Sequence, residues 1–127
     1  MDKEKLGYIA GILDGEGSLR YWQIWSQRHH GSFGFEMTFY NTNRLMLKRI
    51  QRWIGAGSII EKKQPNKAIQ SRKVCYMLQI RERDVIYSFL SQAHHLLTEK
   101  KEKAEQILGI LATLYAAQEY CQAATQG

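Results

Sequence analysis

The sequence has few cysteines and prolines and no long hydrophobic run. Cys75 and Cys121 are far apart and form no CxxC motif, so neither a disulfide framework nor a zinc site is expected. One proline and no low-complexity segment argue against disorder and long linkers. The apolar stretch near the start is interrupted by glycine and aspartate, which predicts neither a signal peptide nor a membrane span. We therefore expect one soluble, intracellular domain over residues 1–127.

Negative charge is also scarce. Eighteen Lys and Arg residues against twelve Asp and Glu residues give a net charge of +6. This balance favours a polyanion such as nucleic acid as partner. On charge alone, a membrane surface or simple solubility are the alternatives.

The first segment predicts a helix over residues 3–15. Asp2 is suited to cap it, and Leu6, Ile9 and Leu13 recur at helical spacing, which gives one apolar face. A second face carries small side chains, although each glycine inside a helix costs about 1 kcal/mol relative to alanine. Such a stripe allows close packing against another helix or, alternatively, against the core of the same domain. The stripe consists of Gly7, Ala10, Gly11 and Asp14.

The rest of the chain alternates between strand and helix patterns. Period-two alternation predicts strands over 18–26 and 33–40, and another pair on either side of the polar loop 63–71. Helical spacing predicts helices over 44–54, 81–97 and 99–124. Asn or Thr is expected at the start of the first, and Asp84 or Arg83 near the start of the second. Thr98 is expected to cap the third. The order αββαββα, followed by one more helix, predicts an α+β fold with helices on one face of an antiparallel four-stranded sheet.

The opposite face of this sheet has no helix left to cover it. Its side chains are cationic, aromatic or able to form hydrogen bonds, which suits contacts to phosphates and base edges, although a solvated face is the alternative. The strand pattern places on this face Arg20, Trp22, Glu36, Thr38, Tyr40, Lys62 and Gln79.

Two histidine pairs and three aromatic residues have simpler interpretations. Adjacent histidines do not share one helix face and no third ligand is evident, so His29-His30 and His94-His95 predict a structural or phosphate-contacting role, not a metal site. The aromatics at helical spacing predict core positions, namely Trp53, Phe89 and Tyr115.

The stretch from Ile9 to Gly17, "IAGILDGEG", resembles the nine-residue signature of the LAGLIDADG homing endonucleases. Ala10, Gly11, Asp14 and Gly17 are identical to it. The αββαββα order is also that of the family, so the resemblance extends over nearly the whole chain. Departures from the signature are the aliphatic exchanges Ile9, Ile12 and Leu13, glycine for alanine at Gly15, and glutamate for the final aspartate at Glu16.

The resemblance implies a saddle-shaped molecule in which the motif helix packs against a second copy of itself. This chain has one motif, and single-motif members of the family act as homodimers on long, near-palindromic sites. The stripe of Gly7, Ala10, Gly11 and Asp14 would then be the dimer interface, with Asp14 stabilising the end of the helix and the junction between subunits.

The resemblance also implies the catalytic residues. Glu16 and the main-chain carbonyl of Gly15 would bind Mg²⁺ or another divalent cation such as Mn²⁺, because hard cations prefer oxygen ligands. Asn41, with Asn43 as the rival, would place water near the metal. Lys100 would stabilise charge at the phosphate, with Lys101 or Lys103 as alternatives.

The activity that the resemblance implies is site-specific cleavage of double-stranded DNA, with intron homing as the biological setting. A chloroplast, a mitochondrion or a microbial cytoplasm would be the location, and neither a membrane nor a small-molecule substrate is expected. The alternative is a non-catalytic nucleic-acid binder of the same fold, an intron maturase or a DNA-binding regulator. A membrane-surface or scaffold protein would not explain the strands. The expected DNA-binding residues are Ser18, Arg20, Trp22, Ile24, Ser26, Arg28, Glu36, Thr38, Tyr40, Lys62, Arg72, Lys73, Cys75, Met77 and Gln79.

Overall fold

In the part of the chain that the structure describes, four α-helices, one short 3₁₀ helix and four strands follow one another in the predicted order. The computed structural model describes residues 1–25, 32–62 and 74–126, and for 120–126 the backbone alone. The expected contacts Ser26, Arg28, Arg72 and Lys73, the pair His29-His30 and the side chain of Cys121 lie outside these described parts. The elements are α1 (Lys3–Glu16), β1 (Gly17–Ile24), β2 (Ser32–Asn41), α2 (Arg44–Ile54), β3 (Ser58–Lys62), β4 (Cys75–Ile80), α3 (Arg83–Ala93), η1 (His94–Leu96) and α4 (Lys101–Gln126).

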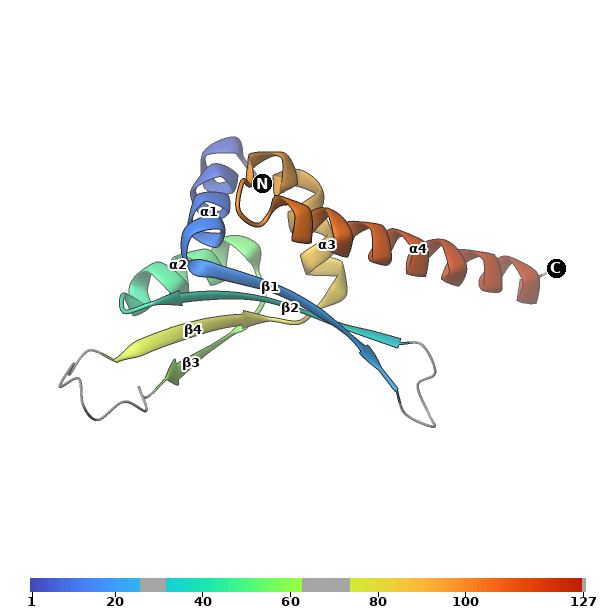
Figure 1. Cartoon of the computed structure of the whole chain (residues 1–127), viewed down its shortest axis with the longest axis horizontal. Coiled ribbons are helices and arrows are strands. Elements are labelled where there is room, and N and C mark those ends of the chain that lie inside the picture. Colours follow the sequence, from blue (N-terminus) through green and yellow to red (C-terminus); the bar gives the residue numbers. More distant parts are fainter. Residues whose placement is uncertain (26–31, 63–73, 127) are drawn as a thin grey trace.

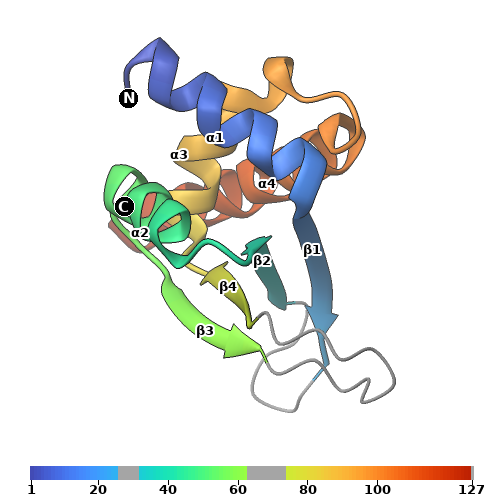
Figure 2. The ribbon, with the colours of Figure 1, turned by 90° about the vertical axis from the view of Figure 1, so that its left-hand side faces the viewer.

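The strands form one antiparallel sheet in the order β1-β2-β4-β3. Figure 1 shows the helices above this sheet, which arches beneath them with its bare face concave, and Figure 2 shows the same two layers from the side. The predicted α+β class, with helices on one face of a curved antiparallel sheet, is confirmed. In the described residues, no helix is long and apolar enough to cross a membrane.

The core lies between the helices and the upper face of the sheet. Leu6, Ile9 and Leu13 of α1 are buried there, as the helical spacing predicts. Alternate residues of β2, including Phe35 and Phe39, are also buried in this core. Among the predicted core aromatics, Phe89 is fully buried, whereas Trp53 and Tyr115 pack against the core from its edge.

Most of the predicted helix starts agree with the structure, and one does not. The side chain of Asp2 accepts a hydrogen bond from the Lys5 amide and Asn43 caps α2 in the same way, both as expected. Arg83 and Asp84 lie at the start of α3, as expected, because Arg83 is its first residue and Asp84 lies in its first turn. The Asp84 carboxylate accepts from the Tyr115 hydroxyl. The predicted start of the last helix is wrong, because α4 begins at Lys101 and the Thr98 amide donates to Asp14, so Thr98 does not cap it.

Gly109 lies on the exposed side of α4. A Cβ at this position would meet no described atom within 4 Å. The alanine replacement should therefore recover helix propensity without a clash.

We expect Gly109→Ala to raise the free energy of unfolding by up to about 1 kcal/mol, because alanine loses less backbone entropy than glycine in a helix. Urea denaturation followed by circular dichroism measures the change. A loss of stability would show that the space beside Gly109 is needed.

Candidate functional site

Helix α1 has an exposed face made of glycines. A Cβ built on Gly7, Gly11 or Gly15 would meet no described atom within 4 Å, so nothing in the described part of the chain requires glycine at these positions. Ala10, expected on the same stripe, is 1% exposed and belongs to the core, so it is not part of the open glycine face. The open stripe runs along the positions i, i+4 and i+8 and ends beside Glu16.

Glu16 is the last residue of α1, and its exposed carboxylate is held by one neighbour. The Asn41 side-chain amide, at the end of β2, donates to Oε2 of Glu16 at 2.7 Å. The Asn41 oxygen accepts from the Asn43 amide, and the Asn43 oxygen is used as the cap of α2. Of the two rival asparagines, Asn41 is therefore the one in direct contact with Glu16.

Asp14 connects the end of α1 to the segment that precedes α4. Its carboxylate accepts from the backbone N–H groups of Thr98, at 3.1 Å, and Lys100, at 2.9 Å. The Lys100 ammonium group donates back to the Asp14 carbonyl at 3.1 Å. The Asp14 side chain is thus bound within its own chain, which agrees with the expected role at the helix end, and its place in a dimer interface stays a prediction.

The three lysines near the start of α4 point to different places. Lys100 contacts the end of α1, whereas the ammonium group of Lys103 lies 5.0 Å from the centre of the Tyr21 ring on β1, and Lys101 is exposed at the first residue of α4. Lys100 is therefore the lysine that shares the neighbourhood of Glu16.

A single copy of the chain offers few metal ligands. Within the described ranges, no group of three His, Cys, Asp or Glu side chains is close enough to hold an ion. His94 and His95 are therefore part of no such group. Nδ1 of His94 lies 3.6 Å from the Glu105 carboxylate, and the His95 ring lies next to the His94 ring. Glu16 brings one exposed hard-oxygen ligand, and Gly15 a backbone carbonyl. These donors fit Mg²⁺ chemically, but hard divalent cations take about six or more oxygen ligands, of which these two groups supply only a part.

The strand register places the expected DNA-contacting residues of the described chain on the bare face. Ser18 pairs with Thr38, Arg20 with Glu36, Tyr40 with Met77, and Lys62 with Cys75. Accessibility within this face is uneven, because neighbours cover Glu36, Thr38 and Met77, which are 5%, 1% and 5% exposed. These three are not free to contact a ligand directly, whereas Trp22 and Tyr40 are exposed.

Glu36 is a buried carboxylate on this face, surrounded by donors. It accepts from Arg20, Gln79 and Arg81 at 2.7–2.9 Å. Burial raises the pKa of the Glu36 carboxyl, but the hydrogen bonds from Arg81, Arg20 and Gln79 outweigh it, so that the pKa lies below its usual value. Glu36 is therefore ionised at neutral pH and forms ion pairs with two arginines.

Sequence reasoning missed Arg81, together with Ser58 and Ile60 on β3. A signal for Arg81 existed, because it continues the alternation of Cys75, Met77 and Gln79 one step beyond the end of β4. Likewise Ser58 and Ile60 share the alternation of Lys62 and pair with the bare-face residues of β4.

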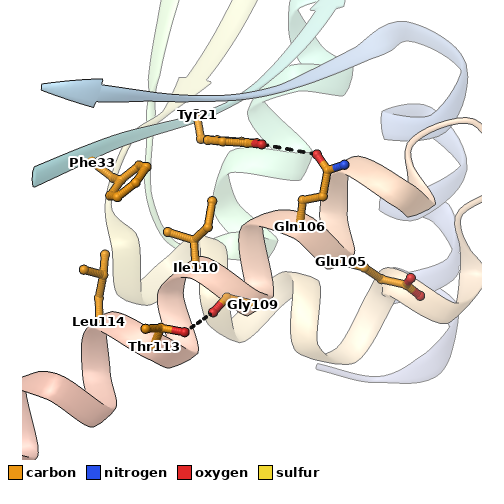
Figure 3. Close-up of a pocket in the computed structure, with 8 residues that line it drawn as sticks. All are labelled: Tyr21, Phe33, Glu105, Gln106, Gly109, Ile110, Thr113 and Leu114. Atoms are coloured by element: carbon orange, nitrogen blue, oxygen red, sulfur yellow. Dashed lines mark hydrogen bonds between the residues drawn. The ribbon is translucent and has the colours of Figure 1, made fainter. Parts of the chain in front are cut away.

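A second candidate is a cavity of about 560 Å³ between α4 and the upper face of β1 and β2. Figure 3 shows Tyr21, Phe33, Ile110 and Leu114 facing it, with the Tyr21 hydroxyl donating to Gln106. This lining is mainly apolar and lies on the opposite side of the sheet from Arg20 and Tyr40. It brings no cluster of groups suited to chemistry on a phosphate.

The fold matches that of solved homing endonucleases. No protein-family profile matches the chain. A solved archaeal intron-encoded homing endonuclease, I-Vdi141I in complex with DNA, superposes with a TM-score of 0.70 at 20% identity, over 91% of this chain and 72% of that one. The homing endonuclease I-CvuI, solved with its target in the presence of calcium, gives 0.67 at 19% identity over 91% and 70%. The LAGLIDADG meganuclease I-AabMI, bound to uncleaved DNA, gives 0.64 at 15% identity over 91% and 38%.

A curated relative adds similarity in sequence. DNA endonuclease I-CreI of Chlamydomonas reinhardtii is 28% identical over 122 residues, which cover 93% of this chain and 69% of that protein. The resemblance to the LAGLIDADG homing endonucleases predicted from "IAGILDGEG" is thus confirmed, in fold by the solved structures and in sequence by this relative.

The ion cluster at Glu36 predicts a pH-dependent contribution to stability. A carboxyl whose pKa is lowered in the folded state stabilises the protein above its ordinary pKa of 4.5. This contribution is lost as the pH falls through the lower, folded-state value. We expect Glu36→Gln to lower the free energy of unfolding at pH 7 by about 1–2 kcal/mol, given that solvent screens the exposed arginines.

Urea unfolding between pH 7 and pH 3 measures this difference, which should shrink below pH 4.5. The exposed Glu61 of β3 offers the control Glu61→Gln, which should change stability little. Equal losses in both variants at every pH would contradict a specific role of the cluster.

Proposed function

We propose that this protein is a site-specific double-strand DNA endonuclease of the homing type, acting as a homodimer with a divalent cation. The observation that carries the proposal is the open glycine stripe of α1, which ends at Glu16. Two copies packed through this stripe would bring two Glu16 carboxylates together, and each chain alone has an incomplete ligand set. The relatives described as homing endonucleases, several of them solved with DNA, support the same activity.

The bare face of the sheet is the proposed DNA-binding surface. Antiparallel strands can enter the major groove, and this face presents Arg20, Trp22 and Tyr40 beside the junction that carries Glu16. The chain's net charge of +6 favours approach to phosphates. A dimer would present two such faces in twofold symmetry, which fits a near-palindromic site.

In the proposed reaction, residues from three elements act at one phosphodiester. Glu16 and the Gly15 carbonyl would hold Mg²⁺ or Mn²⁺, and the cation, when bound, supplies Lewis-acid stabilisation of the scissile phosphate and an activated water. Asn41 holds the Glu16 carboxylate in place through its amide and can orient water. Lys100, anchored through Asp14, brings positive charge to the charge that develops on the phosphate.

Removal of the Glu16 charge should abolish cleavage while binding remains. We expect Glu16→Gln to lose at least a hundredfold in cleavage rate, since one essential ligand is gone. Selection of cleaved duplexes from a partly palindromic DNA library with Mg²⁺ identifies a site for the parent protein. Asn41→Ala should slow cleavage of that site more than Asn43→Ala, whose main cost is a helix cap.

The result that would overturn the enzymatic proposal is specific binding of a duplex that the parent protein never cuts. Such a protein would instead be a nucleic-acid binder with the endonuclease fold. Equal cleavage by the parent and Glu16→Gln would show that the reaction takes place elsewhere.

The homodimer is tested on the glycine stripe itself. Gly11→Leu should produce a monomer without cleavage activity, because the side chain separates two closely packed helices. Gly109→Leu is the matched control, since Gly109 is also an exposed helical glycine with no described atom within 4 Å of its Cβ. Sedimentation equilibrium measures the masses of both variants. A dimer that survives Gly11→Leu would exclude this face as the interface.

A further inference from the structure

Glu36 is an unusual residue for a surface that faces DNA. It is the only carboxylate on the bare face among the residues that the structure describes, and its side chain is 6% exposed. The sheet register pairs Arg20 with Glu36, and the pairing of Met37 with Ile80 brings the next residue, Arg81, to the other side of Glu36. Arg20, Glu36 and Arg81 therefore form a row across three neighbouring strand positions.

Each oxygen of Glu36 has a defined partner. Oε1 accepts from Nη2 of Arg20 at 2.8 Å, and Oε2 accepts from Nε of Arg81 at 2.9 Å. Nε2 of Gln79 donates to Oε2 as well, at 2.7 Å. Three side chains, one from β1 and two from β4 and its end, are thus held by one carboxylate, with distances typical of charge-assisted hydrogen bonds.

Arg20 and Arg81 keep N–H donors that Glu36 does not use and that a ligand could bind. The side chains of Arg20 and Arg81 are 59% and 61% exposed although each is tied to a buried carboxylate. Arg81 bonds Glu36 through Nε, and its two terminal nitrogens have no partner among the described residues. Arg20 also lies over the Trp22 ring, 5.4 Å from its centre, which restricts the guanidinium further. Arginine donates two hydrogen bonds to O6 and N7 of guanine in the major groove.

A purely structural role would not need this arrangement. Burying a carboxylate is costly, and an apolar side chain at position 36 could fill the same place without that cost. What the carboxylate adds is order, because it fixes two long side chains before any ligand arrives and so reduces the entropy lost on binding.

We propose that Glu36 is a specificity-determining positioning residue, which holds the guanidinium groups of Arg20 and Arg81 against guanine edges of the target duplex. This inference rests on the proposed function, in which the bare face of the sheet binds DNA. Glu36 touches no base itself and acts through the two arginines. It also cancels one of their two charges, so that non-specific attraction to phosphates is weakened while base contacts are kept.

The experiment compares base preferences by selecting bound duplexes from a randomised library, which requires no cleavage. The parent protein should prefer guanine at defined positions in each half-site. In Glu36→Gln the preference at those positions should fall roughly tenfold, whereas affinity for unrelated DNA is kept or raised because the net charge rises by one. Arg81→Lys should relax a subset of the same positions, and its combination with Glu36→Gln should add no further loss there.

The control is Glu61→Gln, which makes the same change of charge at an exposed position of β3 outside the row. It should leave the base profile of the parent unaltered. The positioning role would be overturned if the base profile of Glu36→Gln equals that of the parent or is weakened evenly at all positions. In that case the endonuclease proposal would still stand, provided that the parent protein binds and cleaves a specific site. A parent without any sequence preference would overturn both proposals.

Discussion

The geometry of the candidate site depends on the hydrogen bonds that Asp14 makes with the Thr98 and Lys100 amides. These residues are 84 and 86 positions apart from Asp14 in the chain, yet they meet at the last turn of α1. An ionised carboxylate that accepts from backbone N–H groups forms strong bonds, so it can hold a segment that has no regular structure. Through this contact the start of α4 lies beside Glu16 and Asn41, and three elements contribute to one end of the molecule.

Helix α1 and the sheet each have one face that is buried in the core and one face that is open. Leu6, Ile9 and Leu13 place one side of α1 in the core, and the opposite side carries the open glycine stripe. On the sheet, odd-numbered residues of β2 enter the core and even-numbered residues form the lower face. In α1 and in the sheet, one face is thus buried in the core and the other is left open, so the residues of the open faces are not constrained by packing in the core.

The sequence was sufficient to predict the elements, their order and the two faces of the sheet, because periodicity reports directly on burial. It was insufficient wherever a side chain finds a distant partner. Asp14 and Thr98 were assigned local or intermolecular roles, but they bind each other across the fold. Ala10 was placed with Gly7 and Gly11, since small size is visible in a sequence and the direction of a helix face toward the core is not. Asn41 was preferred to Asn43 from the sequence, but its contact with Glu16 is visible only in the structure.

The junction between α1 and β1 contains no loop. Glu16 ends the helix, and Gly17 begins the strand with backbone so close to Leu13 that any side chain at position 17 would collide with it. The Glu16 carboxylate and the first strand of the bare face are therefore parts of one rigid covalent frame. In an endonuclease with this junction, the number of base pairs between the cleaved phosphodiester bond and the recognised bases is fixed. If the protein acts as proposed, changes of side chains along β1 alter which sequence is recognised and leave the place of cleavage within it constant.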